Sequence, residues 1–160
     1  MDNIQVAIMM GSQSDHPTMQ EAADILKKFG VGYEMRVLSA HRTPKETAQY
    51  AEALKDRGVK IVIAGAGGSA ALAGVVAAHT ILPVIGIPIE TTAFNGMDSL
   101  LSTVQMPPGV PVATVAVGKP GAKNAGILAL RILSLSDKKI EKKLEQYREQ
   151  QREKILKTKI

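Results

Sequence analysis

A histidine and an arginine stand side by side at positions 41 and 42, in the stretch LSAHRTPKET of residues 38–47. The pair follows an apolar run typical of a β-strand and precedes a segment with helical spacing. In open α/β sheets, ligands collect at the carboxyl ends of the strands, which is where this pair is expected to lie. An imidazole can move a proton near neutral pH, and a guanidinium can hold an anion. The pair therefore predicts a site for an anionic substrate, with His41 as the proton shuttle.

A second candidate loop, GSQSD at residues 11–15, follows the first apolar run. Pro17 comes next and favours the first turn of a helix. Ser12 and Ser14, together with free backbone N–H groups at a helix amino terminus, form a small anion site suited to a phosphate. Asp15 can accept hydrogen bonds from hydroxyl groups. On this loop alone, an equally good interpretation is that Ser14 or Asp15 only caps the helix.

A third loop, AGAGGSAALAG at residues 64–74, has few side chains, so a ligand could touch its backbone. It matches the dinucleotide-binding fingerprint only weakly, because it follows the third strand and has Ala70 at the third glycine position. The sequence contains no P-loop. The three loops together supply an anion site, a cation, a hydroxyl acceptor, an imidazole and backbone donors. This set suits a phosphorylated ribose that carries a base-like ring.

The elements that must position these loops alternate between strand and helix patterns along the chain. Strands are expected at residues 4–10, 33–39, 60–64, 84–88 and 112–117. Helices are expected at residues 17–29, 43–57, 70–79, 98–105 and 122–134. Strict alternation predicts a parallel sheet with right-handed crossovers, here a flavodoxin-like αβα sandwich of five strands in the order 2-1-3-4-5. Residues 1–160 are expected to form one domain with an α/β core at 1–135.

The last segment, residues 136–158, predicts a long helix of a different kind. Its apolar residues form only a narrow stripe, and its other faces carry many charged side chains: Ile140, Leu144, Tyr147 and Ile155 make up the stripe. Such a helix either lies on the surface of its own domain or packs as an arm on another subunit.

Composition narrows the possible functions of the 160 residues. The chain has no cysteine, which excludes disulfides, thiol nucleophiles and cysteine zinc sites, and no metal constellation is evident. No apolar run approaches the roughly 18 residues of a membrane span, so we expect a cytoplasmic protein without membrane contact. Most of the net charge of +5 comes from residues 137–160, and aromatic residues make up only 3% of the chain. Nucleic-acid binding is therefore not expected.

Several stretches in order along the chain resemble one family. They are MGSQSD at 10–15, SAHRTP at 39–44, AGAGG at 64–68, GIP at 86–88, GMDSLLSTVQMPPGVPVATVAVG at 96–118 and NAGILALRIL at 124–133. Together they resemble the bacterial N5-carboxyaminoimidazole ribonucleotide mutases of purine biosynthesis. The resemblance implies a flavodoxin-like homo-octamer with active sites at subunit interfaces and a carboxyl-terminal helix that reaches across. It also implies that no ATP, metal, biotin or other cofactor is required.

For the reaction, the resemblance makes His41 the general acid and base. The carbamate of the substrate loses carbon dioxide, and His41 protonates the nitrogen that is released. Ring carbon C4 then captures the carbon dioxide, and His41 removes the C4 proton. Since free carbon dioxide must remain in the site between the two steps, the site should exclude water.

The resemblance also implies a set of substrate-binding residues. Phosphate, ribose hydroxyls and carboxylate are each expected to have partners, and residues 105–109 are expected to close over the ring. The binding residues are Ser12 and Ser14 for phosphate, Asp15 for ribose, Arg42 for phosphate or carboxylate, Gly67 and Gly68 as backbone donors, and Ser39 beside the histidine loop.

One departure from the family pattern concerns residues 69–74. The family commonly reads AAHLPG there, whereas this chain reads SAALAG, so Ala71 and Ala73 replace a second histidine and a proline. Two alternatives follow: a carboxylase that uses carbon dioxide directly, or a diverged nucleotide-binding paralogue with weak or no activity. The directly carboxylating branch tends to have Lys after the catalytic histidine, and Arg42 here favours the mutase.

Overall fold

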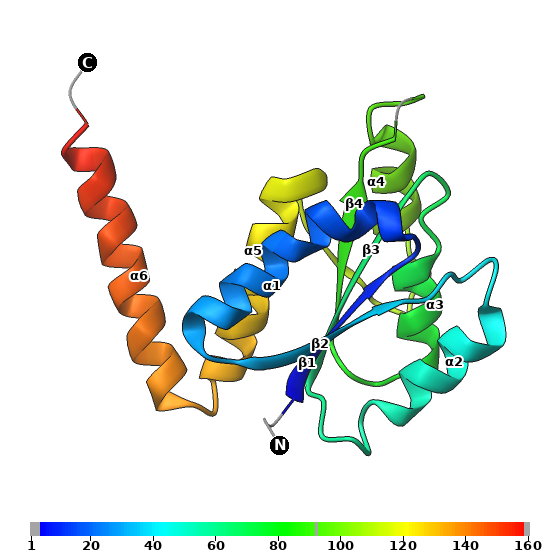
Figure 1. Ribbon diagram of the computed structural model, residues 1–160, viewed down its shortest axis with the longest axis horizontal. Helices are drawn as coiled ribbons and strands as arrows, with labels where there is room; N and C mark the ends of the chain where they lie inside the picture. Colours follow the sequence, from blue (N-terminus) through cyan, green and yellow to red (C-terminus); the bar gives the residue numbers. More distant parts are fainter. Residues whose placement is uncertain (1–3, 92, 159–160) are drawn as a thin grey trace.

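The computed structural model describes residues 4–91 and 93–158 and contains a five-stranded parallel sheet in the order β2-β1-β3-β4-β5 (Figure 1). The strands are β1 (Ile4–Met10), β2 (Gly32–Val37), β3 (Ile61–Gly67), β4 (Val84–Ile89) and β5 (Ala113–Thr114). The predicted flavodoxin-like order is confirmed. All pairings are parallel, so the carboxyl ends of β1, β2 and β3 lie at one edge of the sheet.

Helices cover both faces of this sheet and give the three predicted layers (Figure 1). One face carries α1 and α5, and the other carries α2, α3 and α4. The helices are α1 (His16–Phe29), α2 (Pro44–Ala53), α3 (Leu72–His79), α4 (Met97–Val104), α5 (Gly118–Ser134) and α6 (Lys138–Leu156). No helix in the described part of the chain is long and apolar enough to cross a membrane.

The central strands are apolar on both sides because both of their faces are covered. In β1, Val6 and Ile8 point into the core under α1 and α5, while Ala7 and Met9 point into the core under α2 and α3. Every residue of β4 is buried. This rigid sheet fixes the ends of the strands from which the loops of the site project.

Several elements differ from their predicted bounds: α2 ends at Ala53 instead of residue 57, β3 extends to Gly67 instead of residue 64, and the fifth strand differs most. The apolar run at 112–117 predicted a full strand, but only Ala113–Thr114 pairs with β4. This strand lies at the edge of the sheet, and α5 begins immediately afterwards at Gly118, four residues earlier than expected. Apolar residues of the run pack instead against the two cores on either side, as Val112 and Val115 do. The strand at the edge of the sheet is therefore shorter than its apolar run predicted.

The carboxyl-terminal helix α6 stands beside α1 and α5 on the outside of the domain (Figure 1). Its first half packs on its own domain: Ile140 is buried, and the ring of Tyr147 meets that of Phe29 edge-on with centroids 5.8 Å apart. Lys143 Nζ also donates to the carbonyl of Phe29 at 2.7 Å. From Arg148 onward the described residues are exposed. The expected packing of α6 on another subunit stays a prediction.

Candidate active site

The three predicted loops meet around one cavity of about 420 Å³ at the carboxyl ends of the strands. This volume lies in the usual range for small-molecule sites. Seven of the eight residues predicted for the site line the cavity: Ser12, Ser14, Asp15, Ser39, His41, Arg42 and Gly67. Gly68 is the next residue in the turn but is not among the lining residues.

The loop after β1 is organised by hydrogen bonds within itself. Ser12 Oγ accepts from the backbone N–H of Ser14 at 3.3 Å, and Ser12 N–H donates to Asp15 Oδ2 at 3.0 Å. These reciprocal bonds form a capping box at the start of a short 3-10 helix that leads into α1. Capping and ligand binding are thus compatible interpretations of this loop, since both serine side chains still reach the cavity.

Asp15 is the most buried charged residue of this site, with 9% of its surface exposed. Burial raises the pKa of its carboxyl group, while the Ser12 amide and the nearby Arg42 charge act in the opposite direction. A carboxylate that is held close to other donors and faces a cavity is suited to accept hydrogen bonds from hydroxyl groups of a ligand.

The loop after β2 carries His41 and Arg42 and is closed by a different set of bonds. Thr43 links both ends of the loop, because its Oγ1 accepts from Ser39 N–H at 2.9 Å and donates to Ser39 O at 3.0 Å. Arg42 N–H and Nε each donate to Ser39 Oγ, at 3.2 and 3.3 Å. The main use of Ser39 in this structure is therefore to hold the backbone and side chain of Arg42.

Arg42 joins the first two loops, since its Nη2 donates to the carbonyl of Gly11 at 2.8 Å. Its guanidinium therefore lies beside the loop that contains Ser12 and Ser14, where it can add a positive charge to an anion site. His41 is exposed on the cavity wall, and no hydrogen bond from the described residues holds its ring. The imidazole is thus accessible to a ligand in the cavity.

The glycine loop after β3 forms the opposite wall. Gly68 has a φ of 60°, in the left-handed region that favours glycine. A Cβ at Gly67 would lie 2.8 Å from Thr91 Cγ2 and 3.2 Å from the carbonyl oxygen of Ile89, so a side chain does not fit there. Ala71 also lines the cavity. The position at which the family commonly has a second histidine therefore faces the site in this chain.

The structure adds Thr91 to the cavity wall, and the sequence reasoning missed it. Its hydroxyl donates to Asp98 Oδ2 at 3.3 Å. Thr91 follows β4 at the same edge of the sheet as the other loops, so the strand-end rule could have found it. Residues 105–109, expected to close over the ring, do not line this cavity; Met106 Sδ would lie 3.0 Å from a Cβ added at Gly74 of α3.

No group of three or more potential metal ligands occurs among residues 4–91 and 93–158. The donors that do meet at the cavity are hydroxyl groups, backbone N–H groups, one guanidinium and one imidazole. Groups of these types are suited to hold an anionic small molecule, and an imidazole is a residue type that can transfer protons.

Comparison with known proteins decides the family. The model of the family described as AIR carboxylase matches residues 5–154. The chain belongs to this family. The N5-carboxyaminoimidazole ribonucleotide mutase of Vibrio parahaemolyticus is 56% identical over 153 residues, which cover 96% of this chain and 95% of the relative. The mutase of Saccharolobus solfataricus is 54% identical over 156 residues, with 98% of each chain covered.

A solved structure agrees with the fold. The crystal structure of Treponema denticola PurE superposes with a TM-score of 0.86 at 36% sequence identity, and it covers 95% of this chain and 94% of that chain. The family resemblance inferred from the motifs is therefore confirmed.

Proposed function

We propose that this chain is an enzyme of purine biosynthesis in the cytoplasm that isomerises N5-carboxyaminoimidazole ribonucleotide to 4-carboxyaminoimidazole ribonucleotide. The observation that carries the proposal is the single cavity wall shared by His41, Arg42, Ser12 and Asp15. The mutase names of relatives above 50% identity support the choice of reaction. No cofactor takes part in the proposed steps.

Binding in this proposal begins at the loop after β1. Ser12 and Ser14 donate to the substrate phosphate, and the fixed charge of Arg42, 2.8 Å from the Gly11 carbonyl, adds attraction. Asp15 accepts hydrogen bonds from the ribose hydroxyls. Backbone N–H groups at Gly67 and Gly68 donate to the carboxylate. Together these contacts orient the heterocycle toward the loop after β2.

His41 then performs both proton transfers. The N–C bond of the carbamate breaks and releases carbon dioxide, while His41 gives its proton to the ring's exocyclic nitrogen. The electron-rich C4 attacks the carbon dioxide, forming a C–C bond, and neutral His41 removes the proton from C4. The imidazole ends in its starting protonation state, so one histidine suffices for the whole isomerisation.

The test is an isotope experiment with two substrates. One tube holds N5-carboxyaminoimidazole ribonucleotide with ¹³C in its carbamate, and the other holds aminoimidazole ribonucleotide with ¹³C-bicarbonate. Under the proposal, label reaches the C4 carboxylate in the first tube at low substrate concentration and barely in the second. Efficient labelling in the second tube alone would instead assign direct carboxylation.

A second candidate function rests on Ala71, which lines the cavity where the family commonly has a histidine. If that imidazole is needed, the chain binds the ribonucleotide without turning it over. Tight binding with no label transfer in either tube would establish this function and overturn the mutase proposal. The double variant Ala71→His, Ala73→Pro restores the usual family residues. If the wild type only binds the ribonucleotide, this double variant should gain an activity that the wild type lacks.

We further propose that the active form is a homo-octamer with its sites at subunit interfaces. Large apolar side chains are exposed at and just before α4, namely Phe94, Met97, Leu101 and Val104, and the second half of α6 is also exposed. Such a patch is typical of an interface. Sedimentation should give a mass near eight times 17.0 kDa, lowered by Leu101→Glu. A monomeric mass at concentrations where the enzyme is active would refute this assembly.

A further inference from the structure

Three side chains form a polar cluster between the outermost strand, β2, and the α2 region, and none of them lines the cavity. Glu34 lies on β2, Tyr50 on α2, and Arg57 in the turn that follows α2. Tyr50 donates its hydroxyl to Glu34 Oε1 at 2.7 Å, and Arg57 Nη2 lies 2.6 and 2.7 Å from the two oxygens of the same carboxylate. The guanidinium also lies over the Tyr50 ring, 5.5 Å from its centroid. We call these three residues the Glu34 cluster.

Glu34 lies at the buried end of this cluster, while Arg57 covers it from the solvent side. Only 14% of the Glu34 side chain is exposed, whereas isolated ion pairs on the surface are far more exposed. Burial works against ionisation of Glu34, but hydrogen bonds from Arg57 and Tyr50 outweigh it and lower the pKa of the carboxyl group. Burial, with the Glu34 hydrogen bond, raises the pKa of the Tyr50 hydroxyl. The three groups therefore hold one another in a single protonation state and a fixed geometry at neutral pH.

Helix α2 joins this cluster to the histidine loop, and hydrogen bonds of its first turn continue into that loop. Tyr50, Thr47 and Thr43 are spaced by three and four residues, so they share one side of the helix. Thr47 is fully buried and donates to Thr43 O at 2.8 Å. Thr43 in turn closes the loop onto Ser39, which holds Arg42. Any tilt of α2 against the sheet must therefore move the loop that carries His41.

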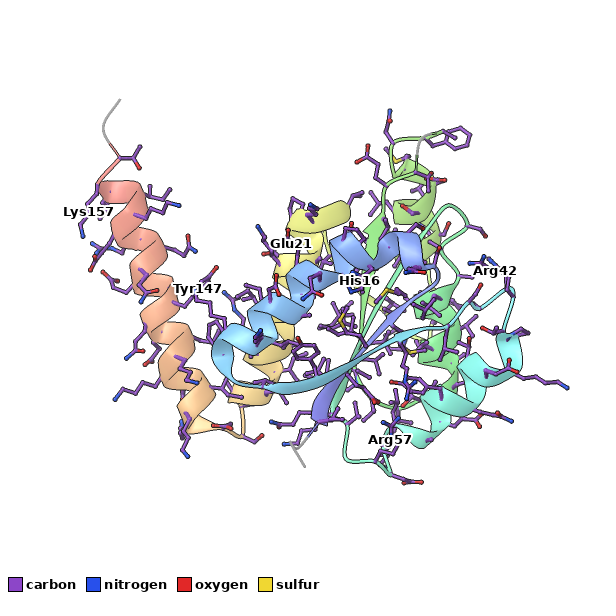
Figure 2. The ribbon with its side chains drawn as sticks, viewed as in Figure 1. His16, Glu21, Arg42, Arg57, Tyr147 and Lys157 are labelled. Atoms are coloured by element: carbon purple, nitrogen blue, oxygen red, sulfur yellow. The ribbon has the colours of Figure 1, made fainter. Side chains whose placement is uncertain are left out.

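Apart from the Glu34 cluster, few side chains anchor α2. Thr47 and Ala51 are its buried residues, Leu54 directly after it is fully buried, and nearby β2 is an edge strand whose one neighbour is β1. Arg42 and Arg57 stand near opposite ends of α2 (Figure 2). Together with buried Leu54, the Glu34 cluster thus fixes the far end of the helix whose near end leads to the His41 loop.

We propose that Glu34, Tyr50 and Arg57 are positioning residues that hold α2, and through it the His41 loop, in register with the phosphate loop. This inference rests on the proposed role of His41 as the proton-transfer group. Its consequence is specific: because the phosphate is bound by the loop after β1, weakening the cluster should slow the chemical step far more than it weakens substrate binding.

The experiment compares Tyr50→Phe with a control on the same helix. Tyr50→Phe removes one hydroxyl and keeps the ring, whereas Glu52→Gln breaks the exposed Glu52–His79 pair of 3.0 Å. We expect Tyr50→Phe to lower kcat by about tenfold, with KM changed less than about twofold, because a displacement of the catalytic group well under 1 Å suffices for such a loss. Glu52→Gln should leave both constants unchanged.

Arg57 provides a second pair of variants, in case Tyr50→Phe also perturbs folding. Arg57→Lys keeps the charge and should recover part of the kcat that Arg57→Ala loses. Equal losses in Arg57→Ala and Glu52→Gln, or a loss confined to KM, would overturn the inference. So would unchanged kcat in both Tyr50→Phe and Arg57→Ala.

A readout independent of turnover separates this inference from the proposed function. The chain has three histidines, so the ring signals of His16, His41 and His79 can be resolved by NMR. Tyr50→Phe should move the His41 signals and leave those of His16, while Glu52→Gln should move only those of His79. The proposed function fails if the wild-type protein turns over neither substrate. The positioning role fails separately, if the His41 signals of Tyr50→Phe stay where they are in the wild type.

Discussion

The loops after β1 and β2 lie at the same edge of the sheet but are held in different ways. The first, from Gly11 to Asp15, is closed by its own capping box and continues into α1, which buries five residues. The second, from Ser39 to Thr43, continues into α2, which buries only two. Both loops are closed by their own hydrogen bonds, but the second is followed by a less buried helix, so its position depends more on contacts along that helix. Substrate binding is assigned to the first loop and proton transfer to the second, so the two functions should respond differently to mutation.

The largest effect is expected at the second loop. His41→Asn keeps a polar side chain of similar size but removes the group that exchanges protons. We expect kcat to fall by about 10²–10⁴-fold, the usual contribution of a general acid or base. Nucleotide affinity, measured by calorimetry, should stay within a small factor of the wild type.

The matched control for His41→Asn is His79→Asn, which removes an exposed imidazole outside the cavity. Its kcat should equal that of the wild type. A His41→Asn protein that retains most of its turnover would show that another group transfers the proton.

An intermediate effect is expected at the first loop. Ser12→Ala combined with Ser14→Ala removes two hydroxyl groups from the phosphate site, while Asp15 can still accept from the Ser12 backbone. Each hydrogen bond to a charged group contributes about 1.5–3 kcal/mol, so KM should rise by at least about tenfold. The kcat at saturating substrate should change little, the reverse of the pattern at His41.

Ser134→Ala is the control for the serine variants, because this partly exposed serine donates to the carbonyl of Arg131 in helix α5, outside the site. Steady-state kinetics over a wide substrate range would measure both constants. An equal fall in kcat and kcat/KM in the double serine variant would mean that the two loops do not separate binding from chemistry.

The sequence could predict the place of the site because strand-end position follows from the order of elements. Residues 4–10 were predicted as a strand and form β1 with the same bounds, since a continuous apolar run buried on both faces has few other structures. The loops after β1, β2 and β3 then had to meet. The cavity unites seven of the eight predicted residues for this reason.

Other features could not be predicted, because their causes are not local in the sequence. Glu34, Tyr50 and Arg57 are separated by up to 23 residues. The sequence around each of them is typical of a residue exposed to solvent. Only the tertiary fold, which places α2 and the following turn near β2, brings them together. The length of β5 depended likewise on the absence of a strand beyond it in the sheet. The proposed role of residues 105–109 came from family resemblance, and in this chain they lie outside the cavity lining.

The smallest effect is expected for Asp15→Asn. This variant tests whether the charged carboxylate of the first loop lowers the stability of the fold while it contributes to ligand binding. The pKa of Asp15 is raised in the folded state by burial, so the folded protein binds this proton more tightly than the unfolded chain. Stability must then fall as pH rises through the window between the unfolded value of 3.8 and the higher folded value. Above that window, the ionised carboxylate costs stability in the fold.

Asparagine keeps a carbonyl oxygen that can accept from Ser12 and carries no charge to bury. The variant should therefore have a slightly higher Tm than the wild type at pH 7, with the difference vanishing below pH 3.8, where the wild-type carboxyl is neutral in both states. Its nucleotide affinity should fall by about fivefold, since a neutral acceptor forms weaker hydrogen bonds than a carboxylate. Calorimetric melts across pH measure the first effect and titrations with the nucleotide the second. A lower Tm of Asp15→Asn at pH 7 would mean that the charge of Asp15 stabilises the loop. The first loop would then not lose stability for the sake of ligand binding, and the two loops would differ only in their packing.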